Sequence, residues 1–125
     1  MKTKKFISAI VFAIATMFGC KAQQDSTIGL ISWEETKTAM AENENIALVD
    51  VRTPEEYAAG SVEGAENINF FDKDFKKQFA KFEKEKPVYI FCKSGNRSGK
   101  ASKILAEMGF KKIYDIEGGY LSWEK

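Results

Sequence analysis

Histidine is absent from the 125-residue chain, and cysteine occurs only at Cys20 and Cys92. The absence of histidine excludes the Ser-His and Cys-His pairs with which many hydrolases activate a nucleophile. Two cysteines without histidine do not supply the ligands of a zinc site, so we expect no metal and no cofactor. A reactive cysteine in this chain must therefore be activated by hydrogen bonds and local electric fields. This condition restricts its chemistry to good leaving groups or to sulfur transfer.

The chain also has no large excess of positive or negative charge. The chain has 19 basic and 18 acidic residues, and 44% of its residues are hydrophobic. At this length, such a composition is typical of one globular domain with a modest core, and it excludes a disordered or fibrous protein. The sequence has no internal repeat and no low-complexity tract.

The first nineteen residues have the layout of an export signal. Lys2, Lys4 and Lys5 precede a stretch of apolar or small residues, Phe6 to Gly19. This stretch is too short to cross a bilayer comfortably, so we predict a signal peptide over residues 1–19. The alternative, a buried N-terminal helix, requires one apolar run without a polar face.

The cleavage site of this signal has two interpretations. Met17-Phe18-Gly19-Cys20 resembles a bacterial lipobox, in which cleavage before the cysteine is followed by its lipidation. Residues 20–27 are then the lipidated Cys20 and a polar tether, and the lipid is the contact with the membrane. We expect a cell-envelope lipoprotein that faces the periplasm or the cell surface. The alternative, cleavage after Ala22, predicts a soluble periplasmic protein.

Loss of the signal also changes the charge of the chain. Without Lys2, Lys4 and Lys5, 16 basic residues stand against 18 acidic ones, a net charge of about −2. Nucleic-acid binding usually requires a basic face, so we expect no nucleic-acid partner.

Lipidation of Cys20 leaves Cys92 without a disulfide partner in the chain, although export permits disulfides. A small buried apolar residue is the ordinary interpretation of such a cysteine.

Residues 28–125 show a regular alternation of strand and helix patterns. Two capping boxes, Ser32 with Glu35 and Thr53 with Glu56, predict helix starts, and phenylalanines spaced by four, four and three residues from Phe71 predict an amphipathic helix. This alternation is typical of an α/β domain with a mostly parallel central sheet and helices on both faces. The expected strands are 27–31, 46–51, 65–70, 87–92 and 112–116, and the expected helices 32–41, 53–60, 71–82, 98–108 and 120–123.

Cys92 opens a short basic loop between the fourth expected strand and the helix that follows. Backbone N–H groups of such a loop converge on an anion, and the helix adds the positive end of its dipole. Lys93, Arg97 and Lys100 add positive charge, and Gly95 permits a turn that a Cβ would hinder. Cysteines placed in this way titrate well below the free value of about 8.5. The loop predicts a nucleophilic thiolate in a pocket for a small oxyanion.

Four segments of the chain carry motifs in a fixed order. They are Asp50-Val51-Arg52 and the residues up to 57, residues 60–68, Cys92 to Ser98, and Gly118-Gly119 to Trp123. Together these segments resemble the rhodanese family over about residues 31–123, as its Asp-Val-Arg signature, its Gly-His-Ile-Pro-Gly-Ala-x-Asn-Ile stretch, its active-site loop Cys-x-x-Gly-x-Arg-Ser and its closing Gly-Gly-x-x-x-Trp. Ser61 and Glu63 stand where the family usually has His and Pro, which alters the rim of the pocket and leaves donor preference open.

The resemblance implies a rhodanese-like fold and sulfurtransferase chemistry. In the family the catalytic cysteine, here Cys92, attacks the outer sulfur of thiosulfate, releases sulfite and holds a persulfide. A thiophilic acceptor, cyanide or a thiol, including a protein thiol, then takes the sulfur. The implied substrate-binding residues are Lys93, Ser94, Gly95, Asn96, Arg97 and Ser98. Asp50 and Arg52, at the end of a strand, are expected to support the site through hydrogen bonds.

Two other functions stay open at this point. A rhodanese module also serves as a sulfur carrier without turnover or as a protein-binding module, because a fold does not fix a function. Cysteine phosphatases and arsenate reductases are a further alternative. Phosphatases with this chemistry use a Cys-x5-Arg loop, whereas four residues separate Cys92 from Arg97, which favours sulfur over phosphate.

Overall fold

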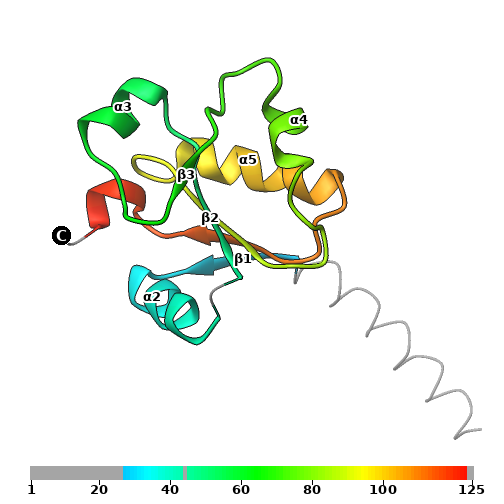
Figure 1. Ribbon diagram of the computed structural model, residues 1–125, viewed down its shortest axis with the longest axis horizontal. Helices are drawn as coiled ribbons and strands as arrows, with labels where there is room; N and C mark the ends of the chain where they lie inside the picture. Colours follow the sequence, from blue (N-terminus) through cyan, green and yellow to red (C-terminus); the bar gives the residue numbers. More distant parts are fainter. Residues whose placement is uncertain (1–26, 44, 124–125) are drawn as a thin grey trace, which may run out of the picture.

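The computed structural model describes residues 27–43 and 45–123, so the predicted signal peptide and Cys20 lie outside it. Within these ranges, five parallel strands form one sheet in the order β1-β5-β4-β2-β3 (Figure 1). None of the helices in these ranges is long and apolar enough to span a bilayer. The strands are β1 (Ile28–Ile31), β2 (Ala47–Asp50), β3 (Glu66–Asn67), β4 (Val88–Phe91) and β5 (Ile113–Ile116).

Helices cover both faces of this sheet, as the alternating pattern predicted. The helices α4 (Phe75–Phe79) and α5 (Asn96–Glu107) lie on one face, and α2 (Trp33–Glu42) lies on the other (Figure 1). The remaining helical segments are α3 (Pro54–Ala59) and the 3-10 turn η1 (Gly119–Ser122). Both predicted capping boxes are confirmed at the starts of α2 and α3.

Strand β4 explains how the sequence directs side chains to these two faces. All four of its residues are buried, as expected for a central strand covered on both sides. Successive side chains of a strand point to opposite faces. Val88 and Ile90 accordingly join the core beneath α4 and α5, while Tyr89 and Phe91 join the core against α2. Cys92 continues the alternation and belongs to the α4–α5 side.

Three elements differ from the sequence-based expectation by more than one residue at an end. The expected strand 65–70 is reduced to Glu66–Asn67, which pair with Val49 and Asp50, because β2 ends at Asp50. The expected helix 98–108 begins earlier, at Asn96, with Gly95 as its N-cap. Ser98 therefore lies in the first turn of α5.

The expected helix 71–82 is the largest departure. Only Phe75–Phe79 is helical, and the Phe71 side chain is 66% exposed instead of buried. The Asn69 side chain accepts a hydrogen bond from the backbone N–H of Phe71 (3.1 Å), and the N–H of Asp72 donates to the Asn69 carbonyl (3.1 Å). These local bonds form a turn that competes with a helix start.

Candidate active site

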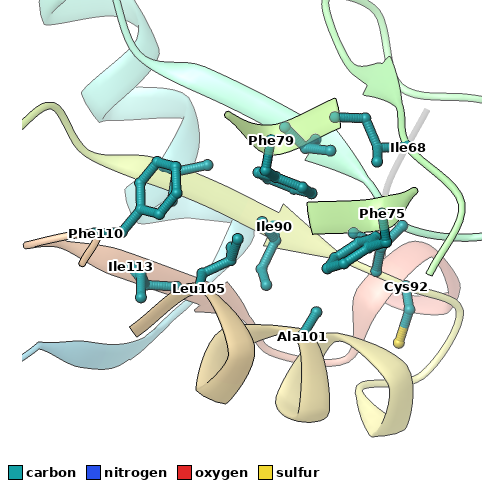
Figure 2. Packing of buried hydrophobic residues seen from close by; sticks show 12 residues of the cluster. Ile68, Phe75, Phe79, Ile90, Cys92, Ala101, Leu105, Phe110 and Ile113 are labelled. Carbon is teal, nitrogen blue, oxygen red and sulfur yellow. The ribbon is translucent and has the colours of Figure 1, made fainter. Parts of the chain in front are cut away.

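The Cys92 thiol lies immediately after β4, at the carboxyl edge of the sheet. In parallel α/β sheets this edge is where ligand sites are found. The residue is 1% exposed, and its sulfur lies beside the start of α5 (Figure 2). Asp50, the last residue of β2, lies in register with Phe91, the last residue of β4. The sheet thus brings the 50–57 and 92–98 motifs to one edge, although they are far apart in sequence.

Two hydrogen bonds involve the Cys92 sulfur directly. The backbone N–H of Gly95 donates to Sγ at 3.0 Å, and the thiol donates to the Ser98 hydroxyl at 3.5 Å. Gly95 has a φ of 121°, a left-handed conformation that side chains disfavour, although open space surrounds its Cα. Glycine at this position therefore allows the chain to turn its N–H toward the sulfur as α5 begins.

The pKa of the Cys92 thiol is lowered in this environment. Burial acts to raise it, but the hydrogen bond with the Ser98 hydroxyl and those from the backbone N–H groups of Ser98, Gly95 and Ser94 act in the opposite direction and prevail. The α5 N-terminus favours a thiolate in the same sense. The thiolate is thus stabilised mainly by hydrogen bonds, as expected for a chain without histidine.

Arg97 is engaged by an acidic partner rather than free in the loop. Its guanidinium donates to both carboxylate oxygens of Glu56 at 2.7 and 3.1 Å. Hydrogen bonding to Arg97 is the main reason that the pKa of Glu56 falls to about 2, and hydrogen bonding to Glu56 raises the pKa of Arg97. The same guanidinium lies 5.8 Å from the centre of the Phe71 ring. The sequence pattern identified Glu56 as a capping residue but missed its pairing with Arg97.

Asp50 and Arg52 form a buried pair behind the loop. Arg52 donates through Nε and Nη2 to the Asp50 carboxylate, with a shortest distance of 2.7 Å, and also to the Gly60 carbonyl at 2.7 Å. Its guanidinium stacks 4.1 Å from the centre of the Tyr120 ring. These contacts tie β2, the end of α3 and η1 together, and both partners are at most 3% exposed.

The remaining loop residues fall into two groups. Lys93, Ser94, Asn96 and Lys100 are exposed, whereas Ser98 is buried and Gly95 and Arg97 are half-buried. The 3-10 turn η1 fixes the start of the loop, because the N–H groups of Tyr120 and Leu121 donate to the carbonyls of Cys92 (2.8 Å) and Lys93 (3.1 Å). The closing glycine motif of the sequence thus contacts the Cys92 loop directly.

Asp115 is a site residue that sequence reasoning missed. It lies on β5, is 8% exposed, and accepts a 2.6 Å hydrogen bond from the hydroxyl of Ser98. Burial raises the pKa of this carboxyl, although the bond from Ser98 opposes the rise. The sequence feature that could have identified it is an acidic residue within the otherwise apolar strand β5. Among the described residues, no group of three or more cysteine or acidic side chains is arranged to hold a metal ion.

Comparisons with known proteins agree with the motifs at this edge of the sheet. Residues 32–125 match the family model of the rhodanese-like domain. The chain is 32% identical to the thiosulfate sulfurtransferase GlpE of Pseudoalteromonas translucida over 68% of this chain and 79% of the relative. It is 31% identical to the uncharacterized protein YqhL of Bacillus subtilis over 94% of this chain and 90% of the relative.

A solved structure shows the same fold. The crystal structure of a rhodanese-like domain protein from Staphylococcus aureus superposes with a TM-score of 0.69 at 31% identity, covering 78% of this chain and 92% of that protein. Sequence and fold therefore point to the same family.

Proposed function

Because this chain belongs to the rhodanese-like domain family, we propose that it is a sulfurtransferase that carries sulfane sulfur on Cys92. The observation that carries the proposal is the position of the sulfur. It lies at the carboxyl end of β4 and the start of α5, where the Gly95 N–H donates to it and its pKa is lowered. A lowered pKa increases the fraction of nucleophilic thiolate near neutral pH. The kinship with GlpE supports thiosulfate as the donor.

The proposed reaction has two displacements at sulfur. The Cys92 thiolate attacks the outer sulfur of thiosulfate, the S–S bond of the donor breaks, and sulfite leaves with the electron pair. Cyanide or a thiolate then attacks the outer sulfur of the Cys92 persulfide and releases the Cys92 thiolate. The backbone N–H groups that stabilise the thiolate would likewise stabilise the negative persulfide between the two steps.

Intact-mass analysis of the full-length chain tests this proposal. After incubation with thiosulfate, we expect a gain of one sulfur atom that cyanide removes as thiocyanate. The Cys92→Ser variant is the control and should gain nothing. Sulfur loading with thiocyanate production supports a thiosulfate sulfurtransferase, and loading without turnover supports a sulfur carrier. No Cys92-dependent adduct would remove thiosulfate as the donor.

A protein thiol is the second candidate acceptor, favoured by two exposed apolar side chains near the loop. Phe71, next to the Arg97 guanidinium, is 66% exposed, and Leu121, whose N–H bonds the loop, is 67% exposed. Exposed apolar side chains beside the loop would add contact area for a protein acceptor. We expect a Phe71→Ala, Leu121→Ala double variant to transfer sulfur several-fold more slowly to a reduced protein dithiol such as thioredoxin, with transfer to cyanide unchanged. Equal slowing with both acceptors would contradict this role.

The location of the protein is proposed from the first residues of the sequence alone. A basic start, an apolar stretch and the Met17-Phe18-Gly19-Cys20 segment support export and lipidation at Cys20. The sulfur-carrying domain would then act in the cell envelope, held at a membrane through the lipid.

A further inference from the structure

The Ser98 hydroxyl has a single proton but lies between several groups that compete for it. Its oxygen is 2.6 Å from the Asp115 carboxylate, 3.2 Å from the Gly95 carbonyl and 3.5 Å from the Cys92 sulfur. The short distance to Asp115 is that of a charge-assisted hydrogen bond. In this arrangement the hydroxyl donates to Asp115 and accepts from the thiol.

The Asp115 carboxyl has a mostly apolar environment. Its neighbours in register are Ile90 of β4 and Leu30 of β1, which carry no charge. From α5 it is approached by Ser98 and by the backbone at Gly99. On the same helix, Arg97 is paired with Glu56, and the charges of Cys92 and Asp50 also contribute to its raised pKa. Ser98 is therefore the donor that stabilises the Asp115 carboxylate.

Formation of the thiolate changes what Ser98 must do. A thiolate has no proton to donate, so the hydrogen bond with the Ser98 side chain, one of four that lower the pKa of Cys92, then requires the hydroxyl to donate to the sulfur. A hydroxyl that donates to the sulfur leaves the buried Asp115 carboxylate without that donor. An unpaired buried carboxylate is unfavourable and tends to take up a proton. Ionisation of Cys92 and protonation of Asp115 are coupled through one hydroxyl.

We propose that Cys92 and Asp115 share one proton through Ser98, so that Asp115 is a positioning residue that takes up a proton from Ser98 when the nucleophile forms. The S–H bond of Cys92 breaks as an O–H bond forms on Ser98. The original Ser98 O–H bond breaks as one forms on Asp115 Oδ1. One negative charge moves from the carboxylate to the sulfur, and no proton leaves the three residues. The proposal rests on Cys92 being the sulfur nucleophile.

This exchange supplies a proton acceptor in a chain that has no histidine. Before transfer, the thiol donates to Ser98 and Ser98 donates to the carboxylate. After transfer, the carboxylic acid donates to Ser98 and Ser98 donates to the thiolate. Both states satisfy the same three groups, and the site carries one negative charge in each. A state with both groups ionised places two negative charges in a buried site with one shared donor, which is disfavoured.

The ultraviolet absorbance of the thiolate, followed against pH, tests the proposal. The full-length chain carrying Cys20→Ser is the parent, so that Cys92 is its only thiol, and a further Cys92→Ser variant is the blank. We expect the parent thiolate to appear in two steps, one for each proton of the coupled pair. We expect Asp115→Asn to give one step at a lower pH than the alkaline step of the parent.

Ser98→Ala separates coupling through the hydroxyl from a simple effect of charge. Combined with Ser98→Ala, Asp115→Asn should shift the thiolate titration by less than half of its shift in the parent. Equal shifts with and without Ser98→Ala would mean that Asp115 acts through space, and a single step unchanged by Asp115→Asn would mean that it does not act on Cys92. Either result would overturn the proposal.

Infrared difference spectra of the parent provide a measurement that needs no substitution at Asp115. As the pH rises, we expect the carboxylic acid band of Asp115 to disappear in two steps that coincide with the two steps of the thiolate absorbance, and in a single step in the Cys92→Ser variant. Loss of this band from the parent in one step, before any thiolate appears, would overturn the proposal. Neither measurement uses a sulfur donor, so their outcome is separate from whether thiosulfate loads Cys92.

Discussion

At the scale of single residues, Gly119 determines how closely η1 approaches the Cys92 loop. Its φ is +56°, and a Cβ there would lie 2.4 Å from the Cys92 carbonyl oxygen and 2.7 Å from that of Lys93. Both carbonyls accept hydrogen bonds from η1, so they have little freedom to move away. We expect Gly119→Ala to lower the free energy of unfolding by about 2–4 kcal/mol in urea titrations and to reduce persulfide formation.

Gly29→Ala is the matched control for this prediction. A Cβ at Gly29 meets only the Tyr114 ring, at 3.4 Å, and the position lies on an edge strand away from the loop. We expect a change of less than about 1 kcal/mol and unaltered sulfur loading. Similar losses of loading in both variants would show that close packing of η1 on the loop is unimportant for the site.

The Glu56–Arg97 pair predicts a pH dependence of stability. Folding lowers the pKa of Glu56 from 4.5 to about 2, mainly through hydrogen bonding to Arg97. This contribution is therefore present above pH 4.5 and is lost as the pH falls from 4.5 toward 2. We expect Glu56→Gln to lower the free energy of unfolding at pH 7 by on the order of 1–2 kcal/mol, allowing for solvent screening.

The Glu56→Gln substitution suits this test because glutamine also serves in a capping box. It keeps the cap of α3 and removes the charge opposite Arg97. Urea unfolding should show a large difference in the free energy of unfolding between the unaltered chain and the variant at pH 7, and a small difference at pH 3. A difference that is equal at both values would assign the effect to capping rather than to the ion pair.

At the scale of elements, α4 shows which of the regularly spaced phenylalanines contribute to the core. Phe79 is fully buried and its ring lies 4.9 Å from that of Phe75 and 6.3 Å from that of Phe110, centre to centre. We expect Phe79→Ala to lower the free energy of unfolding by about 3–5 kcal/mol. Phe71→Ala, in the exposed turn before α4, should change it by less than about 1 kcal/mol. Comparable losses in urea titrations of the two variants would contradict the assignment of Phe79 to the core and of Phe71 to the surface.

The same element shows why part of the fold could be predicted from the sequence and part could not. Phenylalanine spacing identifies a helical face, but it does not detect that Asn69 and Asp72 bond to nearby backbone and delay the start of the helix. Capping boxes, by contrast, are complete within four residues, and both were predicted correctly. Patterns that are satisfied locally can be read from sequence, whereas those that depend on competing turns cannot.

The candidate site divides in the same way. The Cys92 loop and the strand end at Asp50 are contiguous motifs, and their positions at the sheet edge follow from the parallel topology. The contacts of Ser98 with Asp115 and of Arg97 with Glu56 join residues 17 and 41 positions apart, and sequence spacing gives no register between them. These two pairs determine the charge around the sulfur, so the electrostatics of the site emerge only from the folded chain.

At the scale of the whole molecule, the strand order accounts for the enclosure of the nucleophile. Strand β4 lies between β5 and β2, so the end of β4 is flanked by the ends of both neighbours. Asp115 of β5 reaches the sulfur through Ser98, and Asp50 of β2 holds Arg52 beside Tyr120 of η1. A central strand is buried on both sides, and this placement explains why Cys92 is only 1% exposed.

The proposed lipid anchor predicts that location and chemistry can be separated by one substitution far from the site in sequence. The Cys92 sulfur, its hydrogen-bonding partners Gly95 and Ser98, and Asp115 all lie in residues 92–115, whereas lipidation would occur at Cys20. We expect Cys20→Ser to abolish labelling by a radiolabelled fatty acid in bacterial cells and to remove the protein from the membrane fraction. Sulfur loading of Cys92, measured by intact mass, should be unchanged, because a lipid on a tether adds no group to the thiolate environment. Cys92→Ser is the reciprocal control, with labelling retained and loading lost. Labelling that persists in Cys20→Ser would exclude Cys20 as the lipidation site, and a parallel loss of sulfur loading would show that the anchor and the thiol are not independent.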